Sequence, residues 1–78
     1  MFAVINTNTN DQNFGLIGRV ESLHRTAAAA IAKDAAAQRA CRRAPGSNTW
    51  IPQTVVNLGD NVKAKGENVY RDEVSPID

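Results

Sequence analysis

The chain has 78 residues and a formal net charge of +1, which limits it to one small domain. A domain of this size buries only about 60% of the surface that its unfolded chain exposes, so its stability alone is marginal. One cysteine excludes an intrachain disulfide, and one histidine beside it argues against a structural zinc site. We therefore expect no cofactor, and we expect assembly with other chains to supply the missing stability.

Residues 1–13 predict an extended arm. Phe2 to Ile5 is a short strand-like stretch, and the Asn-rich run that follows favours turns and helix caps over regular structure. The start lacks the basic segment and apolar core of a secretory signal peptide, and no stretch approaches the roughly 20 apolar residues that span a bilayer. These features predict cytoplasmic synthesis, no secretion by a signal peptide and no membrane span.

Residues 14–44 predict one long, amphipathic, alanine-rich and basic helix. Ten of the 12 alanines lie between Ala27 and Ala44, and the Pro45-Gly46 pair would end the helix. An apolar stripe at helical spacing is interrupted at Asp34, and its large members are Leu16, Val20, Leu23 and Ile31. We expect this stripe to be the main helix contact. The alanine half that follows is either solvated or packed closely against another chain.

Residues 45–78 predict an extended, hairpin-like arm. Thr54 to Leu58 is rich in β-branched residues, Gly59 to Asn61 and Lys65 to Glu67 resemble turns, and Asn68 to Val74 could add a short strand. Pro52 and Pro76 favour edge or extended segments over central strands. The predicted fold class is therefore an α fold with extended arms, a small α+β protein with one long helix and strand-like ends.

The two arms carry more apolar side chains than a single alanine-rich helix can cover. Unpaired strand edges and exposed aromatic groups would favour aggregation, and adding a strand to a neighbouring chain would remove both hazards. We therefore expect contacts between chains at Phe2, Val4, Ile5, Trp50, Ile51, Val55, Val56 and Leu58.

Charge is distributed unevenly along the chain. Residues 19–43 hold six basic side chains against two acidic ones, whereas residues 59–78 hold three against five. The basic side chains Arg39, Arg42 and Arg43 crowd the expected helix end. They would stabilise the helix dipole, bind a phosphate or pair with an acidic segment of this or another chain. A dedicated nucleic-acid binder is usually far more basic, so nucleic acid is the less favoured partner.

The sequence contains no catalytic motif. His24 and Cys41 would lie more than four turns apart on the expected helix and could not touch. We therefore expect a non-enzymatic structural subunit of a larger assembly, whose partners are copies of this chain or other protein subunits. Architecture alone suggests an accessory capsid, portal or tail component of a phage-type virus particle. The alternative is a small regulatory protein that docks its basic helix on nucleic acid or on an acidic protein surface.

Overall fold

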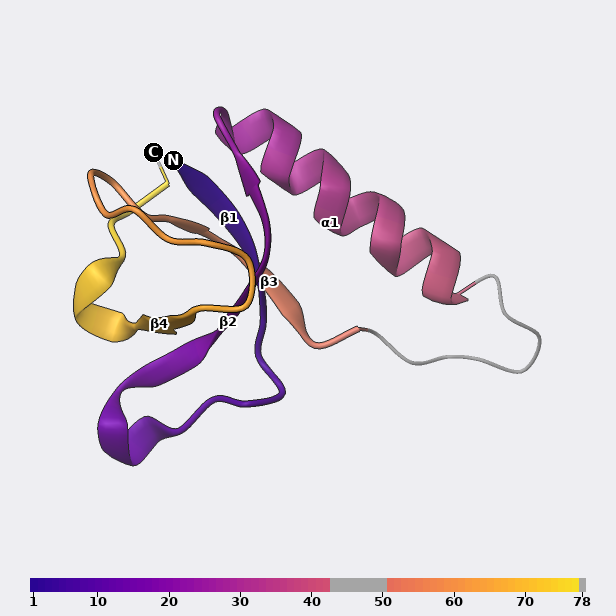
Figure 1. Cartoon of the computed structure of the whole chain (residues 1–78). Helices are drawn as coiled ribbons and strands as arrows, with labels where there is room; N and C mark the ends of the chain where they lie inside the picture. Colours follow the sequence, from indigo (N-terminus) through magenta and orange to yellow (C-terminus); the bar gives the residue numbers. More distant parts are fainter. Residues whose placement is uncertain (43–50, 78) are drawn as a thin grey trace.

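Four strands form one antiparallel sheet, and a helix lies along one of its faces (Figure 1). The computed structural model describes residues 1–42 and 51–77. Its elements are β1 (Phe2–Asn6), η1 (Gln12–Phe14), β2 (Leu16–His24), α1 (Ala27–Arg42), β3 (Gln53–Asn57), β4 (Asn68–Tyr70) and η2 (Arg71–Glu73), where η marks a short 3-10 helix. Strand residues outnumber those of α1, so the predicted α fold with extended arms is wrong.

The helix begins at Ala27, well after the predicted start at residue 14. Residues 16–24 form β2 instead, because Ile17 and Val20 are β-branched and Gly18 is a poor helix former. Thr26 caps the helix, since its Oγ1 accepts a hydrogen bond from the Ala29 backbone N–H at 3.1 Å. The predicted stop at residues 45–46 lies outside the described residues.

The first strand pairs with both of its neighbours, in the order β3-β1-β2-β4. Phe2 lies opposite His24 of β2 on one side and opposite Asn57 of β3 on the other. The register with β2 shifts after Val4, which leaves Glu21 as the extra residue of a bulge. Because β2 and β3 are both antiparallel to β1, they run parallel to each other, and α1 lies in the connection between them.

The main hydrophobic core lies on the sheet face away from α1. Figure 1 shows α1 on one side of the sheet and the segments around β4 and η2 on the other. Strand side chains alternate between the two faces. Those that meet on the far side are Ala3, Ile5, Val20, Val56, Leu58 and Val69, with Ile17, Leu23 and Val74 packed against them. Every residue of this cluster comes from a strand or from the segments that follow β3 and η2.

The helix-covered face is held by small and polar side chains. Val4 and Ala30 are almost fully buried there. The Gln38 side chain exchanges two hydrogen bonds with the Ile51 backbone, each 2.8 Å long, and also donates to Asp34 Oδ1 at 3.3 Å. The polar residues that interrupted the apolar stripe in the sequence therefore fasten α1 to the chain segment that enters β3.

The predicted strands are confirmed, but the extended arms are not. Phe2 to Ile5 lies in β1 and most of the Thr54 to Leu58 stretch lies in β3, whereas the third stretch forms only the short β4. The expected turns form at Gly59 and Gly66, both with positive φ. The strands pair with one another within the chain, and the resulting sheet covers their apolar groups without a second molecule.

Candidate interaction surface

An open depression of about 730 Å³ lies between the two short 3-10 helices. The exposed rings of Phe14 and Tyr70 contribute to its wall, with exposed fractions of 77% and 37%. The other lining residues are polar or glycine: Gln12, Asn13, Gly15, Arg71, Asp72 and Glu73. The depression therefore combines aromatic surface with hydrogen-bonding groups of both charges.

Local hydrogen bonds fix the turn that carries Phe14. Asp11 caps η1, because its Oδ1 accepts from the Asn13 N–H at 3.0 Å and its carbonyl accepts from the Phe14 N–H at 3.2 Å. Gly15 ends the turn with φ of 70°, a conformation that favours glycine. Phe14 is thus presented to solvent by an ordered turn.

The second turn is tied both to the first turn and to a charged pair. The Arg71 N–H donates to the Gly15 carbonyl at 2.7 Å. Glu73 Oε1 accepts from the Tyr70 N–H at 3.0 Å, and Glu73 Oε2 forms an ion pair with Lys63 Nζ at 2.7 Å. Glu73 therefore positions the Tyr70 backbone while Lys63 holds the Glu73 carboxylate.

These contacts make the stability of the fold depend on pH. The hydrogen bond from Lys63, followed by that from the Tyr70 N–H, lowers the pKa of Glu73 below its ordinary value of 4.5. The same contact with Glu73 raises the pKa of Lys63 above 10.5. The Glu73 contribution to stability is present above pH 4.5 and lost as the pH falls through its folded pKa. The Lys63 contribution is present below 10.5 and lost as the pH rises through its folded pKa.

We expect Glu73→Gln to make the melting temperature less dependent on pH at acidic pH. The wild-type melting temperature should fall more steeply than that of the variant below about pH 4.5, because only the wild type must protonate a carboxylate that the fold keeps ionised. Thermal unfolding of both proteins between pH 2 and 7 measures the difference. Two parallel curves would show that the ion pair is not formed in solution.

The residues predicted as a helix stripe do not share one face. Leu16, Val20 and Leu23 lie on β2, and Val20 is buried in the core, whereas Ile31 lies on α1 and is 51% exposed. Ile31 is the exposed member of this set, and its contact with another chain stays a prediction. The apolar spacing led to a wrong helix prediction here, because spacings of three and four residues in this stretch also fit a strand that contains a bulge.

The residues predicted as arm contacts are mostly buried within the chain. Val4, Ile5, Val56 and Leu58 are buried, and Phe2, Ile51 and Val55 are partly buried. Trp50 and Arg43 lie outside the described residues, as does the side chain of Arg42. Arg39 is exposed on α1. A phosphate or acidic partner for these arginines stays a prediction.

The strand β2 brings together a serine and a histidine that the sequence analysis did not pair. Ser22 Oγ lies 2.8 Å from His24 Nε2. Side chains two residues apart on a strand point to the same face of the sheet, whereas on a helix they point to different sides. Predicting a helix for this stretch therefore hid the proximity of Ser22 and His24. A nucleophile with its base still needs an orienting acid, and within residues 1–42 and 51–77 no carboxylate is hydrogen-bonded to His24. Cys41 lies on α1, partly buried, and thus on a different element from His24.

Sequence reasoning missed Phe14 and Tyr70, the two aromatic residues of the depression. Phe14 was placed at the start of a helix, and Tyr70 within a candidate strand. The sequence signal for Phe14 is local: Asp11 as a cap and Gly15 as a left-handed terminator enclose a single turn. Nothing local in the sequence brings Tyr70 beside it, because that requires β4 to pair with β2.

In the part of the chain that the structure describes, no helix has the length and apolar character needed to cross a membrane. The same residues hold no group of three or more His, Cys, Asp or Glu side chains placed to bind a metal ion. No protein-family model matches the chain, and neither a curated protein nor a solved structure shows significant similarity to it.

Proposed function

We propose that the protein is a non-enzymatic structural subunit that assembles with copies of itself, with α1 of one copy lying in the Phe14–Tyr70 depression of the next. The exposed pair of aromatic rings, one on the η1 turn and one at the end of β4, is the observation that carries this proposal. Aromatic residues and arginine supply much of the binding energy at protein interfaces. Burying a phenylalanine side chain contributes about 1.5–3 kcal/mol.

The outer surface of α1 offers a matching occupant. Ala28, Ile31, Ala32 and Arg39 are all exposed, and their spacing places them on one face of the helix, which we name the outer stripe. Solvent-facing helix surfaces are usually charged, whereas this one is mostly apolar. Alanine allows a close approach, and an amphipathic helix laid in a groove through such a stripe is a common mode of recognition.

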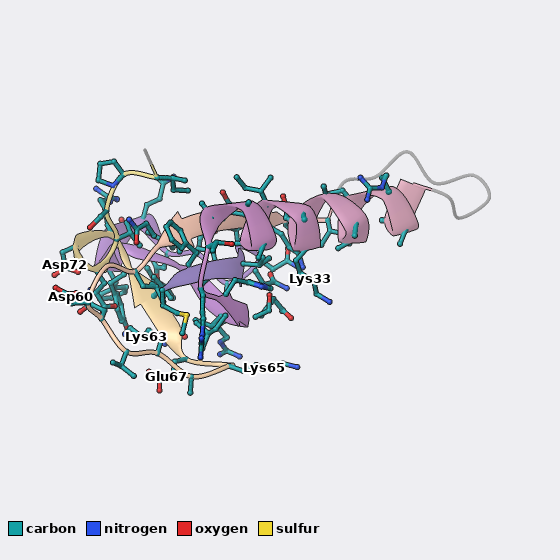
Figure 2. The ribbon with its side chains drawn as sticks, turned by 90° about the horizontal axis from the view of Figure 1, so that it is seen from above. Lys33, Asp60, Lys63, Lys65, Glu67 and Asp72 are labelled. Carbon is teal, nitrogen blue, oxygen red and sulfur yellow. The ribbon has the colours of Figure 1, made fainter. Side chains whose placement is uncertain are left out.

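Charge supports the same pairing. Figure 2 shows Asp72 and Asp60 together at one end of the molecule, whereas α1 extends toward the opposite end. Asp72 lines the depression and Arg39 lies in the second half of α1, so an Arg39–Asp72 pair would join neighbouring copies. Each copy would use two different surfaces, and such contacts generate a closed ring or an open filament.

The features that support assembly differ from those inferred from the sequence. Unburied arms no longer require a partner, because the sheet covers them; the exposed depression and the outer stripe are the features that now support one. A repeating contact of this kind suits an accessory capsid, portal or tail component, and we keep that as the finer proposal.

Sedimentation of the purified protein over a range of concentrations tests the proposal. We expect the mass of the wild type to rise with concentration, and Phe14→Ala to weaken self-association at least tenfold, or about 1.4 kcal/mol. Its folding stability should stay within about 0.5 kcal/mol of the wild type, because Phe14 is mostly exposed. Val62→Ala is the matched control, since Val62 is 93% exposed but does not line the depression.

A charge exchange identifies the two surfaces. Asp72→Lys and Arg39→Glu should each weaken self-association, whereas an equimolar mixture of the two should assemble with the variants alternating, because Arg39 of one then meets Asp72 of the other and the two substituted side chains also have opposite charges. Monomers in the mixture, or two variants that assemble like the wild type, would contradict the proposed contact. Strongly salt-dependent binding of the wild type to a short DNA duplex would instead favour the regulatory alternative.

A further inference from the structure

The end of the chain contacts both edges of the sheet. The two edge strands are β3 and β4. Glu73 Oε1 accepts a hydrogen bond from the Tyr70 N–H of β4 at 3.0 Å, and Ser75 forms an isolated bridge with Asn57 of β3. Between these contacts, Val74 packs against the core cluster. One short segment therefore covers part of each edge.

The hydrogen bonds of β3 show which of its groups face away from β1. The Leu58 N–H donates to the Met1 carbonyl at 2.9 Å, so the backbone groups of the even-numbered residues in this strand point toward β1. Successive residues of a strand direct their N–H and C=O groups to opposite sides. The residues that direct these groups to the outer side, which we name the outer edge, are Gln53, Val55 and Asn57.

Residues 74–77, which we name the strap, hold this edge by two hydrogen bonds. The Ser75 N–H donates to the Asn57 carbonyl at 2.8 Å, and Asn57 Nδ2 donates to the Pro76 carbonyl at 3.1 Å. Pro76 has no N–H to continue the pairing, and in the described part of the chain the backbone of Val55 has no partner on the outer edge. All strap residues after Val74 are exposed, and exposed hydrogen bonds of this kind open at little cost in free energy.

The outer edge is complementary to a second copy of itself. If two β3 strands lie antiparallel with Val55 opposite Val55, each Val55 both donates to and accepts from the other. Asn57 of each copy then lies opposite Gln53 of the other, so that the Asn57 N–H can donate to the Gln53 carbonyl. The place beside Asn57 is the one that Ser75 occupies. The strap and a second β3 therefore exclude each other.

We infer that the strap is an autoinhibitory contact, which keeps β3 from pairing with β3 of a second copy until the strap leaves the outer edge. Proteins commonly cover exposed strand edges, because such edges pair with other chains. The N–H of Tyr70 on the other edge strand is already occupied by Glu73, which makes β3 the edge that release would open. This contact is separate from the one proposed above, because no residue of the outer edge lines the depression.

A proline substitution in the strap tests the inference. Ser75→Pro removes the N–H that donates to Asn57, and Val74 already has the extended conformation that precedes proline (φ −112°, ψ 152°). Ser75→Ala keeps this N–H and is the matched control. Both are made in a Phe14→Ala background, so that the result does not depend on the depression. Sedimentation should show a self-association constant roughly tenfold higher for Ser75→Pro than for Ser75→Ala. Equal constants would overturn the inference.

Amide hydrogen exchange at Val55 identifies the surface. Its N–H lies on the outer edge and should exchange rapidly in a monomer, but slowly once two β3 strands pair. In Ser75→Pro, the protection of Val55 should rise roughly tenfold with protein concentration, while Ser75→Ala should change little over the same range. Association without protection of Val55 would place the contact elsewhere and overturn the inference. If Ser75→Pro does not fold, Pro76→Gly loosens the strap instead, and the same two measurements should change by about threefold.

Discussion

Replacing Ile5 by alanine is expected to destabilise the protein by about 2–5 kcal/mol, much of what a chain of this length has. Ile5 has no exposed surface and belongs to the core cluster on the face away from α1. β1 is paired on both sides, so the sheet cannot close over the resulting cavity without disturbing β2 or β3. For a domain of 60–100 residues, this corresponds to a fall in melting temperature of at least about 8 °C.

Urea unfolding at a fixed protein concentration measures the Ile5→Ala effect. Val62→Ala removes apolar atoms from a side chain that is 93% exposed and should change the unfolding free energy by less than about 0.5 kcal/mol. An equally small change for Ile5→Ala would show that β1 does not occupy the centre of the sheet in the isolated protein.

Gly18→Ala is expected to be at least as damaging as a large core truncation, although it adds only one methyl group. A Cβ at position 18 would lie 2.1 Å from the Asn6 carbonyl oxygen and 2.9 Å from the Asn6 carbonyl carbon. Both atoms belong to the backbone of β1, so no side chain can rotate away and the two strands must separate. Overpacking a well-ordered core typically costs about 1–3 kcal/mol, and we expect this variant to exceed that range.

Gly66→Ala provides the control for the glycine substitution. Gly66 has φ of 90°, so alanine there is strained, but its Cβ would meet nothing within 4 Å. This variant carries only the conformational penalty of about 1–2 kcal/mol. If Gly18→Ala unfolds at the same urea concentration as Gly66→Ala, the close approach of β1 and β2 does not exist in solution.

The parts of the fold that were predictable are those that depend on neighbouring residues. The β-branched run around Val55 and the turn glycines at positions 59 and 66 specify their local structure almost alone. The segment Leu16–His24 does not, because its apolar spacing fits a helix as well as a bulged strand. Pairing with β1 decides between the two, and that pairing depends on residues that are distant in sequence.

The candidate surface was less predictable than the fold. We predicted assembly contacts at large apolar residues such as Ile5 and Leu58, because a long helix would have left them uncovered. Once Leu16–His24 joins the sheet, these side chains have partners within the chain. The exposed Phe14 and Tyr70 come together only through the β2–β4 pairing and the bond from Arg71 to Gly15. The outer stripe could not be located from the sequence either, because the face of α1 that stays exposed depends on how the helix packs on the sheet.

The strand order has a consequence for how the protein folds during synthesis. β1 is made before β2, β3 and β4, yet one of its two edges stays unpaired until β3, about 50 residues later, has been made. Such a separation gives a high contact order, and non-local strand pairing of this kind is slow. The nascent chain through α1 would be a hairpin with an open edge beside a helix, a species that favours association with other nascent chains.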